Sequence, residues 1–202
     1  MAPVHVDPAK VREFEDADAF YEWLSRNHDR ADELWIKIHK KGSGLKSIDA
    51  RQAIDVALCW GWIDGVRKAF DANSFLQRYS PRGARSVWSR INVDNVARLI
   101  AEGRMTGHGL KHVEAARADG RWDRAYGSSR ELTLQPDLLA AIAAEPKAQA
   151  MLPRLNAQNR FALAFRVHNM KTQAGRRKKI ADLVAMLARG ETPYPQKENR
   201  RG

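Results

Sequence analysis

Hydrophobic positions in the first eighty residues follow two different periods. Residues 17–27 carry apolar side chains at helical spacing behind acidic residues that can cap a helix. Residues 34–39, LWIKIH, alternate between apolar and polar positions, which predicts a strand with one buried face. Residues 47–58 return to the helical period, and residues 74–80 predict a further strand.

The segment CWGWIDGVRKAF, residues 59–70, predicts a hairpin. Asp64-Gly65 is a dipeptide that accepts the positive φ angles of a tight turn, and strand-like residues flank it on both sides. Strand alternation would place Trp60 and Trp62 on the same face. We expect Trp60 to be buried beside the helical stripe that ends at Leu58, and Trp62 to be partly exposed and stacked on an arginine such as Arg82.

The pattern becomes helical from about Trp88 onward. Short amphipathic stretches end at Gly103 and Gly120, and residues 128–135 are polar and stop before Pro136, as a linker would. Residues 176–187 predict an amphipathic helix with a buried stripe and with Arg176, Arg177 and Lys178 solvated. The stripe consists of Ile180, Leu183, Val184 and Leu187.

These patterns together predict an α+β fold. Residues 1–127 form a domain with a small antiparallel sheet and helices, residues 128–135 a linker, residues 136–190 an all-helical domain, and residues 191–202 a flexible tail.

Composition narrows the class of protein. The 202 residues are 44% hydrophobic, enough for a real core, and contain no apolar run of the length that a membrane span needs. The first twenty residues lack the order of a signal peptide, so we expect a cytoplasmic protein. The single cysteine, Cys59, excludes an intramolecular disulfide and a cysteine-rich zinc cluster.

The net charge of +11 is concentrated in one segment. Residues 154–179 contain eight Lys or Arg residues and no acidic residue. Such a surface attracts polyanions, and one alternative function is therefore nucleic-acid binding through the C-terminal helices. The candidate contacts are Arg176, Arg177, Lys178 and Lys179. The other interpretation is a solvated helix surface with only unspecific affinity for polyanions.

Aromatic and arginine side chains alternate between residues 60 and 90. Guanidinium groups stack on aromatic rings and bind carboxylates or phosphates with two hydrogen bonds, so this region is the candidate ligand site. The candidates are Trp60, Trp62, Asp64, Arg67, Arg78, Arg82 and Trp88. Two other roles for Asp64 stay open: an ion-pair partner that fixes the turn, or the general acid or base of an enzyme.

Catalytic and metal motifs are weak in this chain. There is no GxSxG or HExxH motif, and the helically spaced His108 and His112 have no third histidine or cysteine nearby. We expect neither a metal nor a cofactor.

Four blocks carry a resemblance to a known family. They are LCWGWIDGVRKAFD, YSPRGARSVWSRIN, LIAEGRMTGHGLKHVEAARADGRWD and KTQAGRRKKIADLVAMLARG. Together they resemble the YdeI/OmpD-associated (bacteriocin-protection) family over about residues 12–190. The resemblance implies an α+β front part and a helical back part, and it supplies no reaction. The hypothesis is a non-enzymatic cytoplasmic stress or antimicrobial-peptide-resistance protein that binds an unknown anionic ligand or protein partner.

Overall fold

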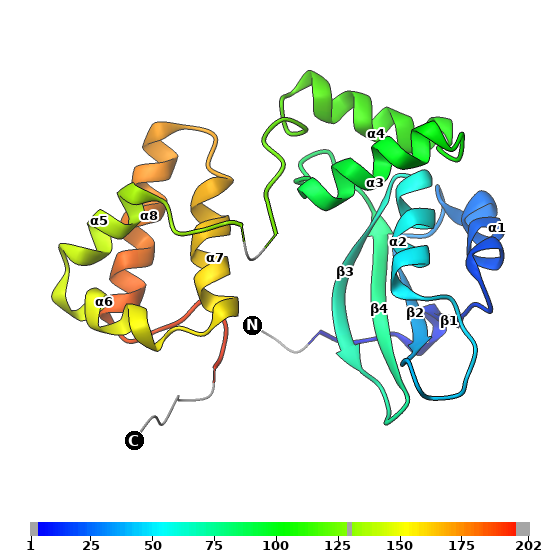
Figure 1. The fold of residues 1–202 in the computed structure, drawn as a ribbon, viewed down its shortest axis with the longest axis horizontal. Coiled ribbons are helices and arrows are strands. Elements are labelled where there is room, and N and C mark those ends of the chain that lie inside the picture. Colours follow the sequence, from blue (N-terminus) through cyan, green and yellow to red (C-terminus); the bar gives the residue numbers. More distant parts are fainter. Residues whose placement is uncertain (1–3, 129–130, 197–202) are drawn as a thin grey trace. The chain divides into compact units, whose positions relative to one another are not determined.

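The chain divides into two units, residues 1–124 and residues 125–202, in a computed structural model that describes residues 4–128 and 131–196. The first unit contains a sheet with helices (Figure 1). The described residues of the second unit form helices and their connections. The predicted α+β fold, with helices in the C-terminal half, is confirmed.

The sheet has four strands in the order β1-β2-β4-β3. Their bounds are β1 Val11–Glu13, β2 Leu34–His39, β3 Trp62–Ala69 and β4 Ser74–Pro81. β2 and β3 both pair antiparallel with β4, but β1 pairs parallel with β2. The sheet is therefore mixed rather than antiparallel throughout. The three residues of β1 are too few to show an alternating pattern in the sequence.

The hairpin between β3 and β4 turns at residues 70–73 and not at Asp64-Gly65. β3 runs through both of these residues, with a shift of register between Asp64 and Arg67. An irregularity of this kind inserts a residue into a strand without ending it. At the real turn, Asp71 Oδ1 accepts a hydrogen bond of 2.8 Å from the backbone N–H of Asn73, so the aspartate that stabilises the turn lies seven positions beyond the predicted one.

Two helices pack on the sheet and enclose the first hydrophobic core. α1 (Ala17–Asn27) is capped by Asp16, and α2 (Ala50–Cys59) begins with a capping box between Asp49 and Gln52. The core contains buried apolar side chains from both helices and the inner face of the sheet. These include Phe20, Leu24, Leu34, Ile36, Ile38, Ala53, Val56 and Trp62.

Two further helices, α3 (Arg90–Ala101) and α4 (Gly107–Ala118), follow the sheet. α4 starts against the C-terminal end of α2, where the Thr106 hydroxyl donates to the Cys59 carbonyl at 2.6 Å. Gly109 lies so close to this carbonyl that a Cβ at position 109 would be 2.4 Å from the oxygen. The missing side chain therefore permits the contact between the two helices.

The described residues of the second unit form four helices with their own core. They are α5 (Pro136–Ala143), α6 (Pro146–Met151), α7 (Ala157–His168) and α8 (Gln173–Ala188). Short 3-10 turns occur at η1 (Pro8–Lys10) in the first unit and η2 (Leu152–Arg154) in the second. The predicted stripe of α8 is buried at Ile180, Leu183 and Leu187, whereas Val184 is only half-buried.

The predicted tail has contacts over part of its length. Hydrogen bonds connect residues 192–196 to one another and to the start of α7. Residues 197–202 lie outside the described residues. In the part of the chain that is described, no helix has both the length and the apolar character required to cross a membrane.

Candidate functional site

Trp62 belongs to the core of the first unit. Its side chain is 1% exposed, its Nε1 donates to the His28 carbonyl at 3.2 Å, and its ring lies edge-on to Trp23. The expectation that Trp62 is partly exposed and stacked on Arg82 is wrong. Trp62 is the first residue of β3, and its side chain lies on the face of the strand that packs into the core.

Trp60 is the less buried of the two tryptophans, contrary to the sequence-based expectation. It caps the C-terminus of α2, and Gly61, with φ of 72°, then turns the chain into β3. Strand alternation therefore does not relate Trp60 to Trp62. The half-buried Trp60 ring lies 4.7 Å from that of His28 and 5.9 Å from that of His108, centroid to centroid.

Arg67 and Arg78 point to opposite faces of the sheet. The Arg67 guanidinium lies 4.2 Å from the centre of the Phe75 ring. Arg67 pairs in register with Gln77, so Arg78, the next residue along β4, faces the other way. Arg78 Nε forms an ion pair of 2.7 Å with Glu33. The structure does not bring these two predicted site residues together.

Asp64 is half-buried within β3, in register with the buried Tyr79. Burial raises the pKa of the Asp64 carboxyl group, and a backbone N–H and the charges of Arg82 and Arg67 oppose that rise. Asp64 lines neither the groove of the second unit described below nor the small hollow around Tyr21. Asp64 therefore lies within a strand and not at the tip of a hairpin, where the sequence placed it.

Arg82 and Trp88 are the predicted site residues that do meet. The Arg82 guanidinium lies 3.6 Å from the centre of the Trp88 ring, and the two side chains are 4% and 2% exposed. Trp88 packs edge-on against Trp122, with ring centroids 4.9 Å apart, and Arg117 lies 5.1 Å from the Trp122 ring. We refer to Arg82, Trp88, Trp122 and Arg117 as the Trp/Arg ladder.

Sequence reasoning missed the second half of the ladder. Arg117 lies in the last turn of α4 and Trp122 follows this helix, both more than thirty residues after Arg82. The local signal was the same as for the first half, because the segment ARADGRWDR also alternates arginine with a tryptophan. Extending the aromatic and arginine search beyond residue 90 would have found it.

Arg121 adds another buried cation beside the ladder. Its Nη1 donates to the Ser86 carbonyl at 2.8 Å, and its Nε forms an ion pair of 2.7 Å with Asp119. The pKa of the nearby His112 is lowered first by burial and then by the positive charges of Arg82 and Arg121. The protein therefore maintains a positive potential in a half-buried region.

The four basic residues proposed for nucleic-acid binding do not form one free surface. Arg176 makes two hydrogen bonds with the Asp137 carboxylate, at 2.6 and 2.7 Å, and a third of 3.2 Å to the Val167 carbonyl. The Asp137 contact raises the pKa of Arg176 and lowers that of Asp137. The expectation of a solvated Arg176 is wrong, whereas Arg177 and Lys178 are exposed and Lys179 is half-buried.

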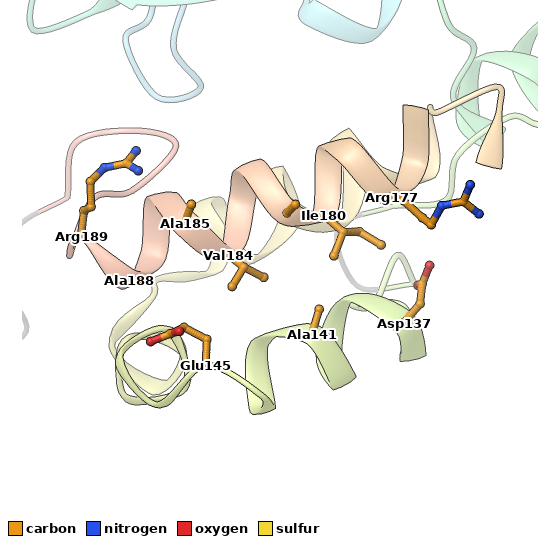
Figure 2. A pocket seen from close by; sticks show the side chains of 10 residues that line it. Asp137, Ala141, Glu145, Arg177, Ile180, Val184, Ala185, Ala188 and Arg189 are labelled. Atoms are coloured by element: carbon orange, nitrogen blue, oxygen red, sulfur yellow. The ribbon is translucent and has the colours of Figure 1, made fainter. Parts of the chain in front are cut away.

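An open groove of about 740 Å³ lies between α5 and α8 (Figure 2). Its floor is apolar and largely made of small side chains, with charged residues at both ends. The lining consists of Asp137, Ala141, Glu145, Arg177, Ile180, Ala181, Val184, Ala185, Ala188 and Arg189. No pattern in the sequence predicts this groove.

Metal-ligating side chains do not cluster in the described part of the chain. Within the described residues, no group of three or more His, Cys, Asp or Glu side chains could hold an ion.

The fold defines a class of protein in which an α+β unit with a mixed sheet precedes a helical unit. Residues 12–112 match the model of a domain of unknown function (DUF8412), and residues 131–190 match the model described as Bacteriocin-protection, YdeI or OmpD-Associated. The first match covers half of the chain, so the chain belongs to the DUF8412 family, and its helical unit is similar to the YdeI/OmpD-associated family. Searches of curated proteins and of solved structures gave no match.

The two matches locate the resemblance more finely than the sequence blocks did. The closing block, residues 171–190, lies within the YdeI/OmpD-associated match, whereas the first two blocks lie within the DUF8412 match. The match to the YdeI/OmpD-associated model supports a function of the bacteriocin-protection or stress-protection type.

Proposed function

We propose that this protein is a non-enzymatic protection protein that binds an anionic ligand or an acidic protein partner at the Trp/Arg ladder. The observation that carries the proposal is the burial of two guanidinium groups, Arg82 and Arg121, beside the paired rings of Trp88 and Trp122. The match to the YdeI/OmpD-associated model supports the protective type of function, and the ladder supports the chemistry of recognition.

Charge at the ladder favours an anion. Removing guanidinium groups from water costs free energy unless opposite charge or hydrogen bonds compensate. Arg121 is paired with Asp119, and Arg82 and Arg117 are two further cations of the same cluster. An arriving carboxylate or phosphate would add negative charge where the protein has concentrated cations.

The shape of the ladder also suits recognition. Trp122 is half-buried and Arg117 is exposed, so this end of the ladder is accessible, while Arg82 and Trp88 are buried. Arg82 and Arg121 donate to carbonyls of residues 86–87 and thereby hold the loop that carries Trp88. A fixed loop loses little conformational entropy when a ligand binds.

Arg117→Ala tests the site without removing a buried group. Pyrophosphate and an acidic polyglutamate peptide serve as probes, with tryptophan fluorescence as the readout and calorimetry as confirmation. We expect at least one probe to bind the wild type and to lose about tenfold in affinity in the variant, which corresponds to about 1.4 kcal/mol. Arg12→Ala, at an exposed position of β1, is the matched control and should bind like the wild type.

Two results would contradict the proposed ligand site. Absence of binding by both probes is one, and an equal loss in Arg117→Ala and Arg12→Ala is the other, since this would indicate unspecific attraction to a cationic protein. The protective role has its own test, in which cells producing wild type or Arg117→Ala protein are challenged with a bacteriocin. We expect survival to fall in the variant at equal protein level.

A further inference from the structure

α8 carries two adjacent stripes with the same spacing. Ile180, Leu183 and Leu187 form the first, which is buried in the core of the second unit. Arg177, Ala181, Val184 and Ala188 form the second, with successive spacings of four, three and four residues, and all four line the groove. Alternating spacings of three and four residues are typical of the contact line between two packed helices. The first stripe packs within the unit, and the second is left open.

The side chains in the groove permit close approach of another helix. Four of its lining residues are alanines, one from α5 and the others from α8. Figure 2 shows Ala141 of α5 pointing toward α8, on the side from which Val184 and Ile180 project. Interaxial distances depend on the side chains at the contact, so small residues allow helices to pack closely.

Each end of the groove carries one acidic and one basic side chain. Arg177 lies at one end beside Asp137, and Glu145 lies at the other end beside Ala188 (Figure 2). Asp137 is already paired with Arg176, and Arg189 with Glu191. Within the described residues, Arg177 and Glu145 have no ion-pair partner. The Glu145 carboxylate also caps α6 by accepting from the Lys147 N–H at 3.4 Å. Arg177 and Glu145 are opposite in sign and separated by about eleven residues of α8, or about 16 Å.

We infer that the groove binds a second copy of this chain, with the two α8 helices packed antiparallel. In that arrangement, the α8 helix of each copy enters the groove between α5 and α8 of the other. Arg177 of one copy then meets Glu145 of the other, and the twofold axis repeats the contact. A parallel arrangement would instead bring Arg177 near Arg177 and Glu145 near Glu145. The charge pattern therefore favours the antiparallel dimer over other pairings of two copies.

This dimer is independent of the proposed ligand site, because the groove and the Trp/Arg ladder share no residue. Failure of one proposal leaves the other intact. The dimer test measures molecular mass by sedimentation equilibrium over a range of protein concentrations. The full chain is used, with circular dichroism to verify that each variant is folded.

Charge reversal separates a specific dimer from unspecific association. We expect the wild type to dimerise, and Arg177→Glu and Glu145→Arg each to raise the dimer Kd by at least about tenfold through repulsion between like charges. The double variant restores both pairs with exchanged signs and should dimerise again. Mixing the two single variants should produce a heterodimer, because both cross-contacts are then attractive.

Lys178→Glu is the control, because Lys178 is exposed on α8 and does not line the groove. It should leave the dimer Kd unchanged. A wild type that stays monomeric at the highest concentration would overturn the inference and leave the groove to a different partner. Single variants that dimerise like the wild type, or a mixture of them that stays monomeric, would overturn it as well.

Discussion

Asn159 and Tyr194 are joined by a reciprocal pair of hydrogen bonds. The Asn159 side-chain oxygen accepts from the backbone N–H of Tyr194 at 2.9 Å, and its amide nitrogen donates to the Tyr194 carbonyl at 3.1 Å. The same nitrogen donates to Gln196 at 2.7 Å, and Asn159 is fully buried. One side chain in the first turn of α7 thus satisfies the backbone of a segment that follows α8.

Replacing Asn159 by alanine should therefore loosen residues 191–196. The variant loses three side-chain hydrogen bonds and leaves polar groups without partners, so we expect the free energy of unfolding to fall by about 1–3 kcal/mol. Limited trypsin digestion should cut after Arg189 faster than in the wild type. Gln158→Ala, an exposed neighbour on α7, is the control. Unchanged digestion in Asn159→Ala would show that the segment does not depend on this contact.

The two tryptophans of the WGW segment should differ in their contribution to stability. Trp62→Ala removes a buried ring and should cost about 3–5 kcal/mol, as large buried aromatics do. Trp60→Ala should cost about 1–2 kcal/mol, because its ring is only half-buried. Urea melts of the two variants measure the difference. A larger loss for Trp60→Ala would contradict the burial described above.

Gly109 and Gly107 form a matched pair on α4. A methyl group at position 109 would meet the carbonyls of Cys59 and Leu58, whereas nothing lies within 4 Å of one at position 107. Gly109→Ala should therefore lower stability by about 1–3 kcal/mol through forced separation of the helices. Gly107→Ala should be neutral or stabilise by up to about 1 kcal/mol, because alanine favours helix. Similar thermal melts for the two variants would show that α4 can shift without cost.

Asp64 should reduce stability at neutral pH. Burial raises its pKa in the folded state, so the folded protein binds a proton more readily than the unfolded chain does. Above the folded-state pKa, the ionised carboxylate therefore lowers the free energy of unfolding. This loss shrinks as the pH falls below the folded-state pKa and is gone below the pKa of the unfolded chain. We expect Asp64→Asn to be more stable than the wild type at pH 7, with an advantage that shrinks in acid.

Urea melts between pH 7 and pH 4 test this difference. Asp94→Asn, at an exposed position of α3, is the control and should follow the wild type at every pH. If Asp64→Asn were less stable at pH 7, attraction of the carboxylate to Arg82 and Arg67 would outweigh its burial.

The sequence predicts those parts of the fold in which one period persists over a whole element. The alternating residues 34–39 form β2, and the predicted C-terminal stripe lies on α8, although Trp35 is buried as well and Val184 is only half-buried. Asp64-Gly65 was misread as a turn because an irregular strand with a glycine resembles two short strands joined by a loop. The three residues of β1 pair with β2 only through tertiary contacts, which no local pattern records.

The site was predictable only where its members lie close together in the sequence. Arg82 and Trp88 are six residues apart and form a cation–π contact, whereas the contact expected for Arg82 was with Trp62. Trp122 joins them because α4 and the segment after it return to the loop, and spacing along the chain cannot show this. The burial of Trp60 and Trp62 is the reverse of the prediction, because β3 starts at Trp62, directly after Gly61, and not at Trp60.

Cys59 has a practical consequence for labelling. It is buried against α4, and burial raises the pKa of its thiol to about 11, so few molecules carry the reactive thiolate at neutral pH. As Cys59 is the single cysteine of the chain, the folded protein presents almost no reactive thiol to a maleimide or a nitroxide reagent. A cysteine introduced at the exposed Asp182 would then take up the label selectively. Distances between spin labels in two copies could be measured without first removing the native thiol.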